Sequence, residues 1–140
     1  MKTTQYVLGF LFSPDKKSVA LIRKNRPDWQ EGLLNGIGGH IEEGEPPSIA
    51  MRREFREETG ITISDWVLKI KYRDKDFQLF IFTAVSDLIV EIRTTTDEKV
   101  FIMGVNRLAE AIPNLKWFIP LLLDPEVLTA EIQGSRIIAE

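Results

Sequence analysis

The chain is built from short apolar blocks separated by polar turns. Five blocks have the length and the β-branched and aromatic content of strands, namely residues 6–12, 18–22, 66–72, 77–85 and 100–105. The charged residues 73–76 join two of these blocks and predict a β-hairpin. Residues 13–17 carry turn chemistry, and residues 25–34 contain Pro, Trp and Gly and predict a loop. We therefore expect a β-sheet at the centre of the fold.

One segment in the middle of the chain predicts a well-bounded helix. Pro46 and Pro47 mark its start, because the missing N–H of proline costs nothing in the first turn of a helix. Met51 and Phe55 stand four residues apart and predict the side that faces the core. Gly60 is a natural C-terminal stop.

The other segments add less regular elements. Residues 35–39 are too rich in glycine for a helix, but glycine lets the backbone approach a ligand closely. Residues 107–112 and 117–123 predict two short helices. Residues 126–140 give no clear pattern apart from a candidate final strand over residues 130–138. Strands mixed with a few helices indicate an α+β or α/β fold.

Composition is typical of one soluble globular domain spanning residues 1–140. The chain is 44% hydrophobic and 28% charged, and it contains no cysteine for disulfides or thiolate metal sites. Since neither a signal peptide nor an apolar run of about 20 residues is evident, we expect a cytoplasmic protein without a membrane partner. The net charge of -3 argues against binding to a nucleic-acid polymer.

Three carboxylates in the predicted helix point to a metal site. Glu54, Glu57 and Glu58 stand at positions i, i+3 and i+4, within an arc of roughly 100° on one side of a helix. Glu54 and Glu58 repel each other at this spacing, and a bound divalent cation would remove that penalty. Oxygen ligands alone suit hard ions, so Mg²⁺ is the first candidate and Mn²⁺ the second.

The residues around these carboxylates complete the pattern of a known enzyme family. The chain resembles the Nudix hydrolases, whose signature has fixed residues at fixed spacing over about two dozen positions. Each of the nine fixed positions is filled, by Gly39, Glu45, Arg53, Glu54, Phe55, Glu57, Glu58, Gly60 and Ile61. The resemblance implies an α/β/α sandwich around a mixed β-sheet. It also implies hydrolysis of a diphosphate linkage in a nucleoside diphosphate derivative.

The resemblance further assigns roles to particular residues. Glu54, Glu57 and Glu58 would bind the metal, and the backbone carbonyl of Gly38 would add a ligand. Arg53 would orient the carboxylates, and Glu45 would support the geometry between loop and helix. The general base would be a glutamate of the signature or a carboxylate of a later loop, for which Glu98 is the candidate.

Candidate substrate contacts lie outside the signature. The segment with Asn35, and Trp117 before Phe118, resemble stretches that bind the base in oxidised-purine nucleoside triphosphatases, although Ile119 interrupts the second stretch. Asn114 resembles the late asparagine that reads the base in MutT-type enzymes. Arg23 and His40 are candidate phosphate contacts. The alternatives are a turn role for Asn35, core packing for Trp117 and plain surface positions for Arg23 and His40.

These features predict a Mg²⁺-dependent pyrophosphohydrolase that cleaves nucleoside triphosphates to monophosphate and pyrophosphate. Oxidised purines such as 8-oxo-dGTP would be the favoured small-molecule substrates, and the protein would be a monomer or a homodimer. A hydrolase of ADP-ribose, dinucleotide polyphosphates or nucleotide sugars is the enzymatic alternative. A nucleotide-binding module without turnover is the alternative from another class, and its signature would usually be damaged.

Overall fold

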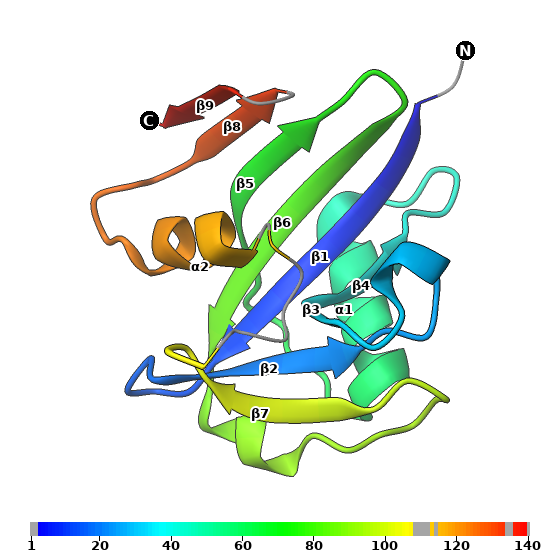
Figure 1. Cartoon of the computed structure of the whole chain (residues 1–140), viewed down its shortest axis with the longest axis vertical. Coiled ribbons are helices and arrows are strands. Elements are labelled where there is room, and N and C mark those ends of the chain that lie inside the picture. Colours follow the sequence, from blue (N-terminus) through cyan, green and yellow to red (C-terminus); the bar gives the residue numbers. More distant parts are fainter. Residues whose placement is uncertain (1–2, 108–112, 114, 134–135, 140) are drawn as a thin grey trace.

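A mixed β-sheet runs through the molecule (Figure 1). The structure is a computed structural model that describes residues 3–107, 113, 115–133 and 136–139. The strands in this part are β1 (Thr4–Phe12), β2 (Ser18–Arg23), β3 (Leu34–Asn35), β4 (Ile37–His40), β5 (Val67–Arg73), β6 (Phe77–Val85), β7 (Val100–Gly104), β8 (Ala130–Gln133) and β9 (Arg136–Ala139). Their main order is β3-β2-β1-β6-β5-β8-β9, while β4 pairs with β1 and β7 pairs with β2.

Strand β1 organises the sheet because it has three neighbours. It runs parallel to β6 along its whole length, from Thr4 beside Phe77 to Phe12 beside Val85. Its other edge pairs with β4 near the N-terminal end and with β2 near Phe12. The sheet therefore divides beside β1, where β4 takes the place that β2 leaves as it turns away (Figure 1).

Alternation along the strands gives the sheet two apolar faces. The helix α1 (Pro47–Thr59) packs on one face, over a buried cluster that includes Val7, Leu11, Met51, Phe55 and Phe82. The helix α2 (Leu115–Leu123) packs on the other face, over a cluster that includes Leu8, Phe10, Ile70, Phe118 and Ile132. This is the expected α/β/α sandwich around a mixed sheet.

The sequence explains the limits and the position of α1. Pro46 is extended, Pro47 begins the helix, and Gly60 ends it with a left-handed φ of 78° while its N–H donates to the Arg56 carbonyl at 2.9 Å. A Cβ atom at Gly9 would lie 2.5 Å from Cε of Met51. The helix therefore sits close against β1, and its neighbouring side, which carries Glu54, lies against Gly39 of β4.

Most predicted elements are confirmed, with a few differences of extent. The predicted final strand over residues 130–138 is instead the antiparallel pair β8 and β9. The predicted loop over residues 25–34 contains a 3-10 helix, η1 (Asp28–Gln30), and a second one, η2 (Asp87–Glu91), follows β6. The predicted helix over residues 107–112 falls almost wholly outside the described residues.

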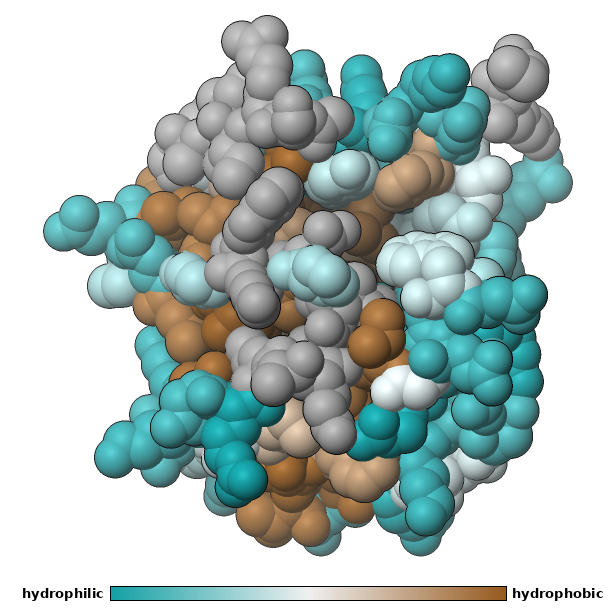
Figure 2. Space-filling model, in the orientation of Figure 1, coloured by the Kyte–Doolittle hydropathy of each residue, from teal (hydrophilic) through white to brown (hydrophobic). Residues whose placement is uncertain are grey.

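The surface differs between the two sides of the molecule. Figure 2 shows hydrophilic residues over the side where β4 and the loop before α1 lie, and apolar residues around α2 and η2. At η2 the apolar surface includes Val90, which is 76% exposed. In the part of the chain described above, no helix is long and apolar enough to span a membrane.

Candidate active site

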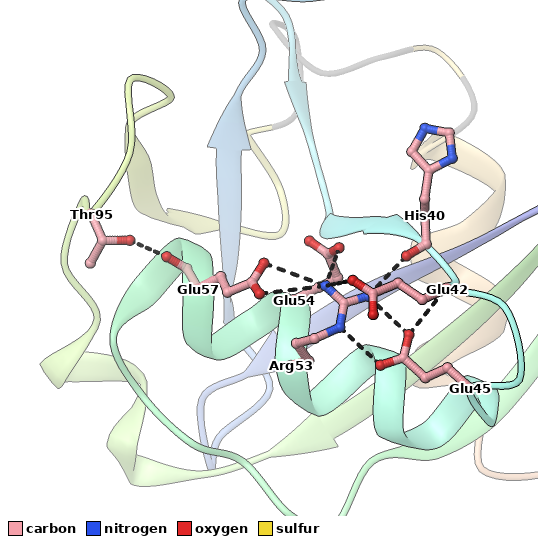
Figure 3. Close-up of polar contacts among 7 residues, drawn as sticks. All are labelled: His40, Glu42, Glu45, Arg53, Glu54, Glu57 and Thr95. Atoms are coloured by element: carbon pink, nitrogen blue, oxygen red, sulfur yellow. Dashed lines mark hydrogen bonds and ion pairs between the residues drawn. The ribbon is translucent and has the colours of Figure 1, made fainter.

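Arg53 is the centre of a polar network on the outer side of α1 (Figure 3). Its Nε and Nη2 donate to the two carboxylate oxygens of Glu45 at 2.9 and 3.0 Å. Its Nη2 also donates to the His40 carbonyl at 3.0 Å. Its Nη1 donates to Glu54 at 2.9 Å and contacts Glu57 at 3.4 Å. One guanidinium therefore joins the helix, the end of β4 and the loop between them.

The Arg53–Glu45 pair fixes the entry of the chain into α1. A planar guanidinium and a carboxylate match in two parallel hydrogen bonds, which makes this pair stronger than a single contact. The hydrogen bonds from Arg53 lower the pKa of Glu45, and the carboxylate in turn raises the pKa of Arg53. Glu45 also accepts from the N–H of Glu42 at 3.1 Å, so the loop folds around it.

Glu54 reaches across to β4 because Gly39 has no side chain. A Cβ atom at Gly39 would lie 2.6 Å from the carboxylate carbon of Glu54. Burial raises the pKa of Glu54, while the hydrogen bond from Arg53 opposes that shift. Glu54 is therefore a desolvated carboxylate that keeps one cationic neighbour.

Glu57 and Glu58 differ in their exposure and partners. The Glu57 side chain is 56% exposed and touches Arg53 only at its distal end. Glu58 accepts a hydrogen bond from the Thr96 hydroxyl at 2.9 Å. Burial raises the pKa of Glu58, and the Thr96 hydrogen bond acts in the opposite direction.

Glu98 lies near this face but has its own partners. It is buried, and its two oxygens accept from the Nζ of Lys24 at 3.1 Å and from the N–H of Asn25 at 2.6 Å. Thr96 links it to the helix, because its hydroxyl accepts from the N–H of Glu98 while it donates to Glu58. Glu98 is therefore held by Lys24 and Asn25 and is linked to Glu58 through Thr96.

Gly38 lies two residues before His40 in β4. Carbonyls two residues apart in a regular strand point to the same side, so the contact of the His40 carbonyl with Arg53 predicts that the Gly38 carbonyl faces α1. The strand comes unusually close to β1 at this position, since a Cβ atom at Gly38 would lie 1.9 Å from the Val7 carbonyl oxygen. Glycine is required there by packing against the backbone.

The donor chemistry of this face fits a hard divalent cation. Glu54 and Glu58 are carboxylates whose burial disfavours their charge. A cation would offset the cost of that buried negative charge. As the side chains lie, however, the described residues include no group of three acidic or histidine side chains arranged to hold a metal ion. Arg53 occupies the space between Glu54 and Glu57 and supplies positive charge there.

Two of the predicted substrate residues, Asn35 and Arg23, contact other groups of the protein. The Asn35 amide donates to Gln30 at 3.3 Å, and its oxygen accepts from the N–H of Gly36 at 2.7 Å. Arg23 donates to the Gly32 carbonyl at 2.6 Å and lies over the ring of Phe101. Both therefore help to shape the loop between β2 and β3, on which Trp29 is 66% exposed.

Two predicted residues lie wholly or partly outside the described part of the structure. Trp117 lies in α2, but its side chain is outside the described part of the structure. Asn114 lies outside the described residues altogether.

Sequence reasoning missed a row of aromatic rings on the α2 side of the sheet. His40 lies 4.5 Å from Tyr6 between ring centroids, Tyr6 lies 6.2 Å from Phe77, and Phe77 stacks on Tyr72 at 5.5 Å. These four residues, here called the aromatic row, come from β4, β1, β6 and β5. Only the pairing of the strands brings them together. His40 belongs to both the Arg53 network and the aromatic row, because its carbonyl accepts from Arg53 and its ring contacts Tyr6.

The chain matches known proteins at the level of family and fold. The family model described as NUDIX domain matches residues 2–122. A solved structure from work on MutT of Aliivibrio salmonicida and Vibrio cholerae is 22% identical, with a TM-score of 0.73 over 86% of this chain and 98% of that one. MutT from Bacillus halodurans is 21% identical, with a TM-score of 0.72 over 96% of this chain and 97% of that one.

A third solved structure, a MutT Nudix hydrolase from Burkholderia pseudomallei, is 17% identical. Its TM-score is 0.72 over 87% of this chain and 99% of that one. A comparison with curated protein sequences gave no significant match. At these identities the solved structures establish the fold, and the family model, which covers most of the chain, establishes the membership. The chain belongs to the Nudix hydrolase family.

Proposed function

We propose that this protein is a Mg²⁺-dependent pyrophosphohydrolase that converts nucleoside triphosphates to monophosphates and pyrophosphate. Purine nucleotides, with 8-oxo-dGTP and dGTP first among them, are the proposed substrates. The observation that carries the proposal is the Arg53 network, which gathers Glu45, Glu54 and Glu57 beside the backbone of β4. Nudix hydrolases generally use divalent metal ions and act on small nucleotide substrates. The carboxylates of this face would bind such an ion.

Glu54, Glu57 and Glu58 would hold the metal together with the Gly38 carbonyl. Bound Mg²⁺ supplies charge neutralisation at the phosphates and lowers the pKa of a coordinated water. Mn²⁺ offers the same oxygen-ligand chemistry and is the second choice. Arg53 would keep Glu54 and Glu57 directed outward from the helix, and its pairing with Glu45 would keep the helix itself in place.

The general base would be Glu57 or Glu98. Glu57 is largely exposed and can reach a water molecule beside a bound substrate. Glu98 is buried, and both of its oxygens already accept hydrogen bonds from Lys24 and Asn25. We therefore favour Glu57 as the proton acceptor and give Glu98 the role of holding Lys24 and the start of the next loop.

The aromatic row supports a flat, aromatic substrate group. Base stacking on an aromatic side chain is worth roughly 1–3 kcal/mol per base. Tyr6 and Phe77 are half-buried and lie next to His40, whose carbonyl contacts Arg53. A nucleotide with its base on this row would have to cross the edge of the sheet at His40 for its phosphates to reach the helix carboxylates. Asn35, Asn114 and Trp117 remain proposed base contacts, and Arg23 and His40 remain proposed phosphate contacts.

A panel of substrates with Mg²⁺ tests the proposal. The panel contains 8-oxo-dGTP, dGTP, the other deoxynucleoside triphosphates, ADP-ribose and diadenosine polyphosphates, and the products are separated by ion-exchange chromatography. We expect pyrophosphate and a monophosphate, with the highest kcat/KM for a purine triphosphate. Glu57→Gln should abolish turnover, whereas Glu126→Gln, in the exposed loop after α2, should leave it unchanged.

Each alternative gives a different result in the same assay. Rapid turnover of ADP-ribose with triphosphates untouched would overturn the substrate assignment and leave the metal site standing. Nucleotide binding without any turnover in Mg²⁺ or Mn²⁺ would indicate a binding module and overturn the enzymatic proposal.

A further inference from the structure

Residues 94–98, between η2 and β7, lie against the last turn of α1 and are held from two sides. On the helix side, the Thr95 hydroxyl donates to the backbone carbonyl of Glu57, and the Thr96 hydroxyl donates to the Glu58 carboxylate at 2.9 Å. On the other side, the amide of Asn25 donates to the Asp97 carbonyl at 2.7 Å. The segment is thus fixed between α1 and the residues that follow β2.

Two further contacts strengthen the hold on the side of β2. Arg26 and Asp97 form an ion pair, and the buried Glu98 accepts from Lys24 and Asn25. The position of Thr96 is therefore set by its flanking residues and does not depend on its own contact with Glu58. A hydroxyl carried on such an anchored segment can direct a flexible glutamate side chain.

Thr95 and Thr96 form different kinds of hydrogen bond with α1. Thr95 binds a main-chain carbonyl, which moves only if the helix moves. Thr96 binds a carboxylate oxygen and at the same time accepts from the N–H of Glu98 at 3.2 Å. The hydroxyl can also donate to the Glu98 carbonyl at 3.5 Å, but the Glu58 oxygen is much closer, so the shorter contact assigns its hydrogen to Glu58. The contact selects one orientation of the Glu58 carboxylate.

We propose that Thr96 is a positioning residue that orients Glu58 for metal binding, while Thr95 only docks the segment on the helix. This inference rests on the proposed function, because it takes Glu58 as a metal ligand. Groups that hydrogen-bond a metal-binding carboxylate fix its direction, and their loss typically weakens metal affinity by about 10- to 100-fold. Since Thr96 is exposed, we expect a change near the lower end of that range.

The test measures Mn²⁺ binding to nucleotide-free protein through the electron paramagnetic resonance signal of free Mn²⁺. Thr96→Val keeps the shape of the side chain and removes the hydroxyl, and it should weaken binding about tenfold. Thr96→Ser retains the hydroxyl and should bind like the unmodified protein. Thr95→Val removes the neighbouring contact and serves as the matched control. We expect it to change the Mn²⁺ affinity by less than about twofold. Thermal unfolding of each variant verifies that it is folded.

The outcomes separate this inference from the proposed function. Equal Mn²⁺ affinity in Thr96→Val and in the unmodified protein would overturn the positioning role and leave the metal site standing. Equal weakening by Thr95→Val and Thr96→Val would overturn it too, because the segment would then act only by docking. If the unmodified protein bound no Mn²⁺, both the metal site and this inference would fail.

Discussion

The carboxylate face of α1 and the aromatic row lie on opposite sides of the sheet and are held by different forces. On the α1 side, charged groups fix one another through the hydrogen bonds of Arg53, and burial of Glu54 is opposed by that cation. On the α2 side, Tyr6, Phe77 and Tyr72 are arranged by strand pairing and ring contacts. On the proposed function, this contrast corresponds to a division of labour, in which the first side would perform the reaction and the second would hold the substrate.

The largest expected effect comes from removing one charge on the carboxylate face. Glu54→Gln keeps the size of the side chain but removes a proposed metal ligand. We expect kcat/KM to fall by about 10²- to 10³-fold, comparable to losing one preorganised group that stabilises developing charge. Steady-state kinetics with Glu126→Gln as control measure this. A loss confined to KM would contradict the division between the two sides.

Replacement of a ring in the aromatic row should change binding and leave chemistry alone. Tyr6→Leu preserves an apolar side chain but removes the stacking surface between His40 and Phe77. Loss of one stacked base contact corresponds to a rise in KM of roughly 5- to 140-fold for purine triphosphates. We expect kcat to stay nearly constant, and a fall in kcat at constant KM would place Tyr6 with the reacting groups instead.

The Arg53 network should also contribute to stability. Arg53→Lys keeps the charge but loses the two parallel hydrogen bonds to Glu45, which an ammonium group cannot reproduce. We expect the free energy of unfolding to fall by about 1–3 kcal/mol, as for hydrogen bonds to charged groups. Urea denaturation measures this change. A matched substitution on a solvated part of the same helix, Arg52→Lys, should have almost no effect.

The smallest effect is a dependence of stability on pH. Burial raises the pKa of Glu58 above its ordinary value of 4.5, so the folded protein holds this proton more tightly than the unfolded chain does. Its contribution is fully present below the ordinary pKa and is lost as the pH rises through the raised one. Glu58→Gln cannot ionise, so without metal its stability relative to the unmodified protein should rise between pH 4 and pH 7. A difference that falls with increasing pH would show that Thr96 and Lys24 outweigh burial.

The parts of the fold that depend on neighbouring residues could be predicted from the sequence. The helix from Pro47 to Thr59 and its stop at Gly60 follow from proline, apolar spacing and glycine, and the hairpin of β5 and β6 follows from its charged turn. The division of residues 130–138 into two strands was not foreseen, because short apolar runs do not specify where a chain reverses. The parallel pairing of β1 with β6 joins residues far apart in the sequence, and no local pattern encodes it.

The same distinction applies to the candidate site. Glu54, Glu57 and Glu58 share one helix, so their spacing alone placed them on one side. The contact of Thr96 with Glu58 and the aromatic row depend on the docking of separate segments. Gly39 could be identified by spacing, but the reason for glycine at this position, the closeness of the Glu54 carboxylate, required coordinates.

Arg53 also bears on when the protein can fold. Because its guanidinium is permanently charged, the acidic groups around it have a counter-ion from the moment the chain folds. Newly made protein therefore need not wait for a divalent ion to reach its native state. It should survive purification in a chelator, and if the proposed dependence on Mg²⁺ holds, a cell short of magnesium would accumulate folded, idle protein that recovers as soon as the ion returns.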